Sequence, residues 1–179
     1  MIIIGFGANL CGKYGSPEDA LRSCAQKFAS KSIHITASSH IWKSAPVPIS
    51  DQPWYKNAVC SVETTLSPHD LLKALNELEN EAGRVRTTQN APRVLDLDLL
   101  AYHETYINDD VLKLPHPEMH NRAFVLYPLQ EIVPNWVHPT LNKTVDEMIK
   151  SLPKEQKIRK VTGDILYPAP MDKLDKVPA

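Results

Sequence analysis

The chain has 179 residues, a length that fits one domain, because a single hydrophobic core usually occupies ~100–200 residues. Its residues are 42% hydrophobic and 23% charged, which is ordinary for a globular protein, and a net charge of -1 argues against a nucleic-acid partner. The start lacks the basic and apolar regions of a signal peptide, and no apolar run approaches the ~20 residues of a membrane span. We therefore expect a soluble, cytoplasmic protein that binds no membrane.

In chain order, the first predicted element is a buried strand over residues 1–7, a β-branched run that ends at glycine. A helix follows, because Ser16 is a typical N-cap, with Pro17 at the first helical position and Asp19 three residues after the cap. The same Ser-Pro-x-Asp-x-Leu pattern starts again at Ser67 and predicts a second helix, with Gly83 as its C-cap. The recurrence fits two similar halves, although a generic capping signal that recurs by chance explains it equally well.

Further strands are predicted over residues 33–42, 58–65 and 94–102, so the core elements follow as strand, helix, strand, strand, helix, strand. This β-α-β-β-α-β order is that of a ferredoxin-like α/β sandwich, an α+β fold in which helices cover one face of an antiparallel sheet. Two C-terminal helices are predicted outside this core, one over residues 121–132 and a short one capped by Thr144.

The strongest indication of chemistry is the acidic pair Asp96 and Asp98 on the last predicted strand. Side chains alternate between the faces of a strand, so both carboxylates project from one face while the intervening leucines face the core. Two such charges repel by roughly 2–3 kcal/mol at an effective dielectric of about 20, so a cation is expected beside them. The candidates are Mg²⁺, which accepts carboxylate and phosphate oxygens, or the neighbouring arginines of an ordinary polar surface.

Three arginines precede the acidic pair: Arg84, Arg86 and Arg93. Guanidinium groups bind phosphate oxygens bidentately and neutralise charge that develops as a phosphoryl bond breaks. Basic and acidic residues together therefore indicate a phosphoryl-transfer site. The loop between them suits a lid over a nucleotide, although a plain surface loop has the same composition.

Tyr55 and Asn57 indicate a pocket for a heterocycle, because they offer a stacking face and hydrogen-bonding groups for a ring edge. A turn with core packing is the alternative for this pair. Downstream, a histidine between prolines, an arginine and a second aromatic ring are present as His116, Arg122 and Phe124. Zinc is not expected here, because no glutamate follows the histidine as H-E-x-x-H requires.

Together these residues resemble the 6-hydroxymethyl-7,8-dihydropterin pyrophosphokinase family of folate biosynthesis. The resemblance covers about residues 1–150 and rests on ordered motifs at residues 5–10 (GFGANL), 51–59 (DQPWYKNAV), 83–86 (GRVR), 92–100 (PRVLDLDLL), 114–117 (LPHP) and 122–126 (RAFVL). It implies the ferredoxin-like fold, with residues 1–151 as the catalytic domain and residues 152–179 as a tail without an assigned role.

By this resemblance, the protein transfers the β,γ-diphosphate of ATP to the hydroxymethyl oxygen of the reduced pterin and releases AMP. The implied catalytic residues are Arg84, Arg93, Asp96 and Asp98, and the two aspartates would hold two Mg²⁺ ions. The implied ATP-binding residues are Leu72, Asn76, Arg84, Arg86, Arg93, Leu99, His116 and Arg122. The implied pterin-binding residues are Ser44, Ala45, Val47, Tyr55, Asn57, Asp96 and Phe124. A monomer is expected, with ATP and the pterin as its only ligands besides the metal.

Three positions depart from the family pattern. The loop at residues 87–91 lacks a tryptophan that often stands before the Pro-Arg pair, so lid closure over the pterin is expected to differ. Pro48 and Cys11 stand where glycines are common, and Pro48 is expected to stiffen the substrate loop.

Two other classes of function are alternatives. An Asp-x-Asp nucleotidyltransferase would use the same metals to transfer a nucleotide and release diphosphate. A ligand-sensing or RNA-binding module is the alternative from outside the enzymes. RNA binding, however, needs exposed aromatic residues on the sheet and a basic surface, which the sequence does not indicate.

Overall fold

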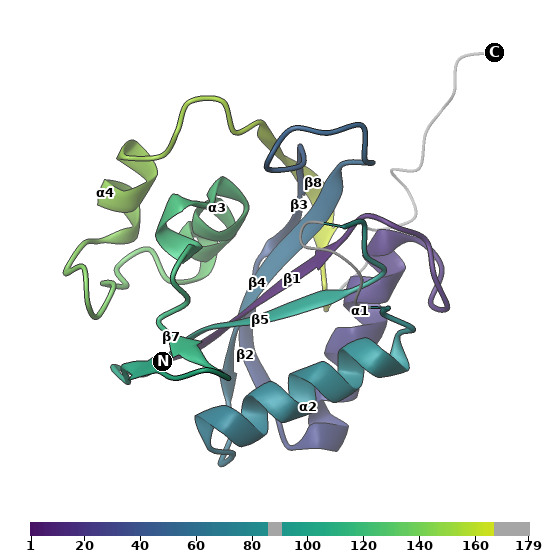
Figure 1. Cartoon of the computed structure of the whole chain (residues 1–179), viewed down its shortest axis with the longest axis horizontal. Coiled ribbons are helices and arrows are strands. Elements are labelled where there is room, and N and C mark those ends of the chain that lie inside the picture. The colour runs from purple at the N-terminus through teal and green to yellow at the C-terminus, as the bar shows by residue number, and fades with distance from the viewer. Residues whose placement is uncertain (86–90, 167–179) are drawn as a thin grey trace.

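The computed structural model describes residues 1–85 and 91–166, which form one six-stranded sheet with helices on both faces (Figure 1). The strands run in the order β5-β1-β4-β3-β8, with β2 also pairing to β4, and every pair is antiparallel. Their bounds are Ile2–Ala8 (β1), His34–Ser38 (β2), His40–Ser44 (β3), Tyr55–Glu63 (β4), Asp96–Tyr102 (β5) and Ile158–Asp164 (β8). A second, two-stranded sheet joins β6 (Ile107–Asn108) to β7 (Lys113–Leu114).

Within the described ranges, four α-helices cover this sheet. Helices α1 (Pro17–Lys27) and α2 (Pro68–Glu81) lie together on one face, whereas α3 (Ala123–Ile132) and α4 (Val145–Lys150) lie on the other (Figure 1). The short 3-10 helix η1 (Phe28–Lys31) follows α1, and the 3-10 helix η2 (Met119–Asn121) precedes α3. The expected one-sided arrangement therefore holds for α1 and α2, and the C-terminal helices add a layer on the opposite face.

The helix starts follow the capping residues that the sequence indicated. Ser16 Oγ accepts the Asp19 N–H at 3.2 Å, and the Asp19 carboxylate accepts the Ser16 N–H at 3.1 Å, which confirms the capping box of α1. Ser67 Oγ likewise accepts the Asp70 N–H at the start of α2. Gly83 follows α2 with a φ of +88°, a left-handed conformation that glycine adopts without steric cost.

One predicted strand is in fact two. The expected strand over residues 33–42 is interrupted at Ser39, whose buried hydroxyl accepts the Val59 N–H at 3.0 Å. The Ser39 N–H in turn donates to the Val59 carbonyl at 2.9 Å. Both β2 and β3 pair with β4, and this local irregularity separates them.

Alternation along β5 confirms the expected division of its side chains. The leucines predicted to face the core are buried beneath α1 and α2: Leu95, Leu97 and Leu99. On the other face, Leu100 packs in a second core with residues of α3 and α4. Asp96 and Asp98 share that second face with Leu100, so β5 presents both carboxylates on the side of α3.

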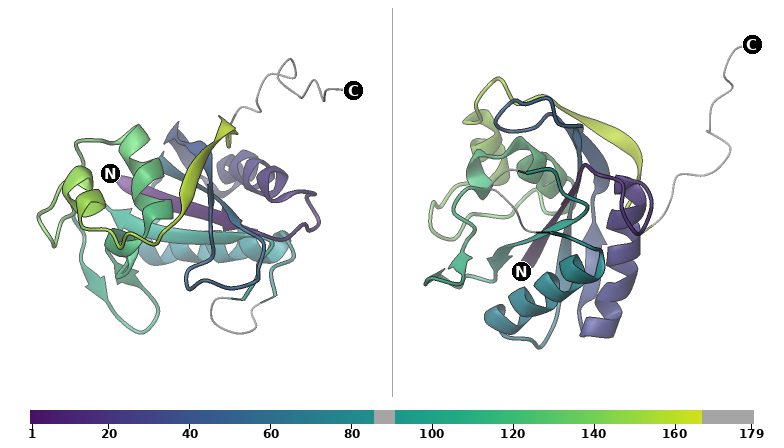
Figure 2. Two further views of the ribbon diagram at one scale, coloured as in Figure 1. Left: turned by 90° about the horizontal axis from the view of Figure 1, so that it is seen from above. Right: turned by 45° about the vertical axis from the view of Figure 1, so that its right-hand side comes forward.

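Part of the segment without an assigned role, residues 152–179, is a sheet strand. Strand β8, the yellow arrow in Figure 2, pairs with β3 at the edge of the sheet. Ile158 of β8 lies opposite Ser44 of β3. The Ala45 N–H also donates to the Lys157 carbonyl at 3.0 Å. Residues 167–179 lie outside the described part of the chain.

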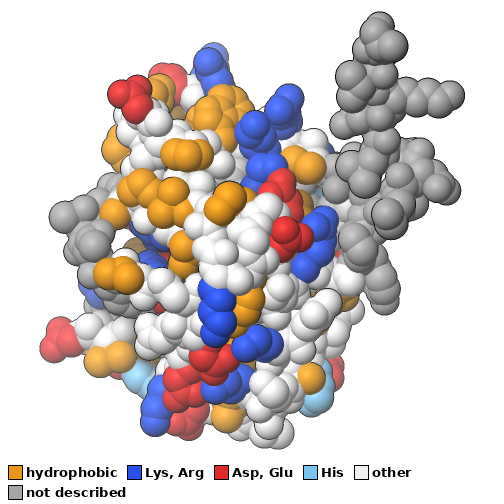
Figure 3. Space-filling view, turned by 90° about the vertical axis from the view of Figure 1, so that its right-hand side faces the viewer, with side chains coloured by type: hydrophobic (Ala, Val, Ile, Leu, Met, Phe, Trp, Pro, Cys, Tyr) orange, Lys and Arg blue, Asp and Glu red, His pale blue; other side chains and the backbone are white. Residues whose placement is uncertain are grey.

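Charges of both signs are interspersed over the surface shown in Figure 3. Lys27 pairs with Glu81 at 3.1 Å and Lys31 with Glu77 at 2.9 Å, contacts that join η1 and the end of α1 to α2. Such exposed pairs contribute little to stability individually. None of the helices in the described residues has the length and apolar character needed to cross a bilayer.

Glu131 of α3 fastens that helix to the sheet. Its carboxylate accepts the His40 N–H at 3.0 Å and the Trp42 Nε1–H at 2.8 Å, and it pairs with Lys160 Nζ at 2.8 Å. Burial by itself raises the pKa of Glu131, but the donors from Lys160 and His40 outweigh it, and the pKa lies below its usual value. One carboxylate thus joins α3, β3 and β8.

Glu131→Ala is expected to lower the free energy of unfolding by about 2 kcal/mol, because several partly buried donors lose a charged acceptor. This corresponds to a fall in Tm of about 4–8 °C, measurable by calorimetry at pH 7. The loss should shrink below about pH 4. A carboxyl group whose pKa is lowered by folding stabilises the fold at a pH above its unfolded-state pKa, and this stabilisation is lost as the pH falls through its folded-state pKa. Glu104→Ala, at an exposed loop position, is the control, and an equal loss in both variants would contradict the assignment.

Candidate active site

A pocket of about 820 Å³ lies between β1, β4 and β5, the loop after β3, the start of α3 and the segment before β8. Its volume is in the range that binds small molecules. The lining includes every expected pterin-binding residue, the expected metal ligand Asp98 and two of the expected phosphate ligands: Ser44, Ala45, Val47, Tyr55, Asn57, Phe124, Asp96, Asp98, Arg93 and Arg122. The structure therefore brings together residues from most of the length of the chain.

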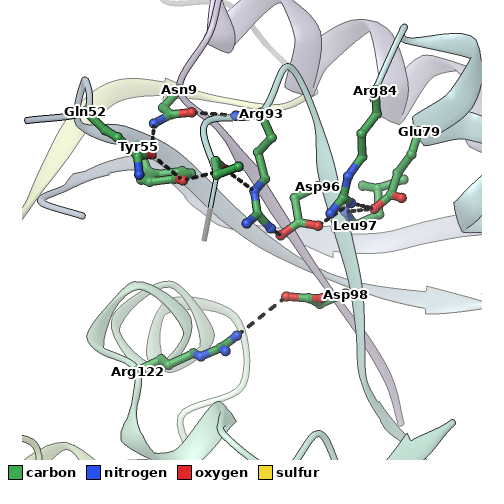
Figure 4. A network of polar contacts seen from close by, with 11 residues as sticks. Asn9, Gln52, Tyr55, Glu79, Arg84, Arg93, Asp96, Leu97, Asp98 and Arg122 are labelled. Carbon is green, nitrogen blue, oxygen red and sulfur yellow. Dashed lines mark hydrogen bonds and ion pairs between the residues drawn. The ribbon is translucent and has the colours of Figure 1, made fainter. Parts of the chain in front are cut away.

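Asp96 is held between two arginines (Figure 4). Arg93 Nη1 donates to Asp96 Oδ2 at 2.6 Å, and Arg84 Nη1 donates to Asp96 Oδ1. The side chains are mostly buried, with 20% of Asp96, 21% of Arg93 and 13% of Arg84 exposed. Both carboxylate oxygens of Asp96 are therefore engaged by guanidinium groups.

Glu79 of α2 is a site residue that the sequence analysis did not identify. Only 1% of its side chain is exposed, and Oε1 accepts both the Leu97 N–H of β5 at 2.8 Å and a hydrogen bond from Arg84. Because β5 is an edge strand, Glu79 satisfies a backbone donor that has no strand partner. A charged residue on the buried stripe of α2 was the available signal, since a buried charge requires a partner.

Asp98 has a weaker partner than Asp96. Arg122 Nη1 lies 3.8 Å from Asp98 Oδ2, beyond hydrogen-bonding distance, and 34% of the Asp98 side chain is exposed. Desolvation and the neighbouring charge of Asp96 raise the pKa of Asp98 to about 7, against the opposing effect of Arg122. Figure 4 shows its carboxylate pointing toward Arg122 and away from the two arginines that hold Asp96. The charge of Asp98 is only partly balanced, so a cation beside it would be stabilising.

This donor set fits a divalent cation that takes most of its ligands from substrate and water. In the part of the chain that the structure describes, no cluster of three or more His, Cys, Asp or Glu side chains is arranged to hold a metal. Mg²⁺ is typically bound by one or two carboxylates together with water and phosphate oxygens. Asp96 and Asp98 suit that mode of binding, whereas a closed zinc site would need four protein ligands.

Tyr55 and Asn57 are positioned by hydrogen bonds at the start of β4. Tyr55 Oη donates to Gln52 Oε1 at 3.1 Å, and Asn57 Nδ2 donates to Ser44 Oγ at 2.8 Å. Asn57 is buried, with 3% of its surface exposed, so its amide has a fixed orientation in the wall of the pocket. An amide held in this way can distinguish donors from acceptors on the edge of a ring.

Asn9, directly after β1, connects two loops that lead into the pocket. Its Nδ2 donates to Gln52 Oε1 at 3.2 Å and to the Pro53 carbonyl at 3.0 Å, while its Oδ1 accepts the Arg93 N–H at 2.9 Å. The loop that leads to Tyr55 and the loop that carries Arg93 are therefore fixed to one buried side chain. Asn9 lies in the motif at residues 5–10 and had no predicted role; a polar residue directly after a buried strand was its only local signal.

Arg122 and Phe124 lie at the start of α3, and the guanidinium of Arg122 is 5.6 Å from the centre of the Phe124 ring. His116 lies nearby, and its backbone N–H donates to the Leu100 carbonyl at 2.8 Å. Burial and the charge of Arg122 lower the pKa of His116 to about 4. Because Nδ1 accepts the Glu118 N–H at 3.1 Å, the neutral ring carries its proton on Nε2.

Residues 3–134 match the model of the family described as 7,8-dihydro-6-hydroxymethylpterin-pyrophosphokinase (HPPK). The chain belongs to this family. The 2-amino-4-hydroxy-6-hydroxymethyldihydropteridine pyrophosphokinase of Haemophilus influenzae is 38% identical over 157 residues, which are 87% of this chain and 95% of that protein. The folic acid synthesis protein FOL1 of Dictyostelium discoideum is 39% identical over 161 residues, or 90% of this chain.

Some HPPK relatives are much longer than this chain, which spans 24% of Dictyostelium FOL1 and 20% of fol1 from Schizosaccharomyces pombe. A crystal structure of Plasmodium falciparum HPPK-DHPS has a TM-score of 0.63 to this structure at 12% sequence identity, covering 84% of this chain and 44% of that one. That likeness shows a shared fold. The match to the family model and the identity to the Haemophilus influenzae protein confirm the family named from the sequence motifs.

Several residues expected to bind ATP in an HPPK lie outside the pocket lining. Leu72 and Asn76 are on α2, and Leu99 of β5 is buried beneath that helix. Arg84 reaches the pocket through its contact with Asp96. Arg86 lies outside the described residues. The roles of these residues stay predictions.

In the ligand-free HPPK chain, Asp98→Asn is expected to raise the stability at pH 8 by about 1–2 kcal/mol, because it removes a charge that burial and Asp96 disfavour. Tm should rise by about 2–6 °C. A carboxyl pKa raised by folding means that the wild type gains stability as pH falls from 8, so the advantage of the variant should vanish near pH 4. Calorimetry between pH 4 and 8, with the exposed Asp110→Asn as control, measures this difference; a lower Tm for Asp98→Asn at pH 8 would contradict it.

Proposed function

We propose that this chain transfers the β,γ-diphosphate of ATP to the hydroxymethyl oxygen of 6-hydroxymethyl-7,8-dihydropterin and releases AMP, a step of folate biosynthesis. The observation that carries the proposal is a single pocket in which an aromatic and amide wall, with Tyr55 and Asn57, meets an acidic pair flanked by arginines. Such a pocket suits a planar polar heterocycle next to a phosphate chain. Membership of the HPPK family supports the same reaction.

The pterin lies between Tyr55 and Phe124, with Asn57 at its edge and with Ser44, Ala45 and Val47 lining the same space. The fixed orientations of Asn57 and Tyr55 support this assignment, because a site whose side chains are already held loses less entropy on binding. The two rings supply stacking faces, and the amide supplies specificity for one arrangement of donors and acceptors.

The triphosphate binds to Arg84, Arg86, Arg93, Arg122 and His116, with Leu72, Asn76 and Leu99 on the nucleotide side. A guanidinium has five N–H donors, so Arg84 and Arg93 can bind phosphate oxygens while they hold Asp96. His116 is neutral at pH 7 and donates through Nε2. Phosphoryl transfer depends mainly on positioning and charge stabilisation, which these fixed donors supply.

Asp96 and Asp98 would hold two Mg²⁺ ions together with the phosphates. When bound, the ions neutralise phosphate charge and align the phosphate chain with the attacking oxygen. The weak ionic partner of Asp98 supports this role, since its carboxylate gains most from added positive charge. The arginines keep the carboxylate of Asp96 oriented on the same face of β5.

The fold is of the ferredoxin-like type, with residues 1–151 as the catalytic domain. The strand order supports this topology, because β5 and β1 lie side by side, β4 follows them, and β2 and β3 pair next to β4. A monomeric, cytoplasmic enzyme without nucleic-acid or membrane partners completes the proposal. Light scattering on the purified chain measures the oligomeric state.

Incubation of the purified chain with ATP, Mg²⁺ and 6-hydroxymethyl-7,8-dihydropterin, followed by separation of the nucleotides, tests the reaction. We expect AMP in amounts equal to the pterin diphosphate formed, and no turnover without Mg²⁺. Release of inorganic diphosphate would instead indicate a nucleotidyltransferase.

Asp98→Asn and Asp98→Ala should reduce kcat at least about 100-fold while unfolding cooperatively, because the side chain serves the transition state and not the core. Near-normal turnover in these variants would refute the metal assignment.

The aromatic rings of Tyr55 and Phe124 predict a separate effect on the affinity for the pterin. Tyr55→Ala and Phe124→Ala should each weaken pterin binding by about 2 kcal/mol, or ~30-fold, because a stacking face is lost. Binding of a non-hydrolysable ATP analogue should change by less than about threefold in the same calorimetric titrations. Tyr106→Ala, at a residue that is 67% exposed, is the matched control. Equal losses for both ligands would argue against the two rings enclosing the pterin.

A further inference from the structure

Gln156, in the segment before β8, forms hydrogen bonds on both sides of Arg122. Its Oε1 accepts the Ala123 N–H at 2.8 Å, and its Nε2 donates to the Asn121 carbonyl at 2.7 Å. One side-chain amide therefore holds the backbone immediately before and after Arg122. A bidentate contact of this kind fixes the direction as well as the position of the backbone.

This contact takes the place of an ordinary helix cap. The first N–H groups of a helix have no acceptor within the helix, and α1, α2 and α4 obtain one from Ser16, Ser67 and Thr144. The N-cap residue of α3 is Arg122, whose side chain makes no capping hydrogen bond. The acceptor at α3 comes instead from Gln156, 33 residues away in the sequence. The start of α3 thus depends on a tertiary contact.

The same short segment is bonded to the opposite wall of the pocket. The Lys157 carbonyl accepts the Ala45 N–H at 3.0 Å, and Ile158 pairs with Ser44. The segment also lines the pocket through Pro153, Glu155, Gln156 and Lys157. Residues 156–158 therefore join the start of the 44–48 loop to the start of α3, and they lie beyond the family match, which ends at residue 134.

We propose that Gln156 is a positioning residue: by holding the backbone on both sides of Arg122, it directs Arg122 toward Asp98 and holds Phe124 against the space proposed for the pterin. Arg122 lies 3.8 Å from Asp98 and 5.6 Å from the Phe124 ring centre, so a small displacement of the start of α3 changes both contacts. Its kinetic consequence rests on the proposed function, whereas the contact with the start of α3 does not.

Gln156→Ala tests the proposal, with the exposed Lys154→Ala as the matched control. Amide hydrogen exchange at Ala123 should accelerate at least about tenfold, since the N–H loses its acceptor. The KM for the pterin should rise about tenfold, equivalent to 1.4 kcal/mol, while the control changes neither quantity. Gln156→Glu should give a smaller rise, because it keeps the acceptor for Ala123 but places a second oxygen against the Asn121 carbonyl.

Unchanged exchange at Ala123 in Gln156→Ala would overturn the proposal, as would faster exchange with an unchanged pterin KM. A loss of kcat alone, in proportion to the fraction of unfolded protein, would show a purely structural role and would also overturn it. If Gln156→Ala does not fold, Gln156→Glu carries the same two measurements. Failure of the wild type to release AMP would overturn the proposed function, while exchange at Ala123 would still decide whether Gln156 holds the start of α3.

Discussion

Asp96 and Asp98 stand two residues apart on one strand, and the fold must hold both carboxylates in a partly desolvated pocket. The two are compensated unequally. Asp96 receives hydrogen bonds from Arg84 and Arg93, whereas Asp98 has Arg122 at 3.8 Å and a raised pKa. The arginines offset most of the charge of Asp96, whereas the charge of Asp98 is only partly offset, so an added cation would stabilise Asp98 more.

The rest of the pocket is arranged around this acidic pair by buried polar side chains that come from distant parts of the chain. Glu79 holds Arg84 against β5, Asn9 connects the loops of Tyr55 and Arg93, and Gln156 holds the start of α3. Side chains held in this way lose less entropy when a ligand binds, which suits a reaction that depends on positioning more than on covalent chemistry.

The features that the sequence predicted well are local ones. Capping residues such as Ser16 and Ser67 act within one turn of helix, and alternation along β5 follows from strand geometry, so both could be read without tertiary information. The break at Ser39 and the pairing of β8 with β3 depend on partners far along the chain, and no local pattern marks them. The site residues were found largely through ordered motifs shared with a family, which is why Gln156, outside those motifs, was not found.

Binding of a divalent cation should require the triphosphate, because Asp96 and Asp98 supply too few ligands to fill a coordination sphere. The most direct measurement is a titration with Mn²⁺, followed by electron paramagnetic resonance, with and without a non-hydrolysable ATP analogue and corrected for Mn²⁺ held by the analogue alone. We expect binding to the wild type to be at least about tenfold tighter with the analogue, or 1.4 kcal/mol, and this gain to disappear in Asp98→Asn. Equal Mn²⁺ affinity with and without the analogue, or an unchanged gain in Asp98→Asn, would contradict the assignment of the acidic pair.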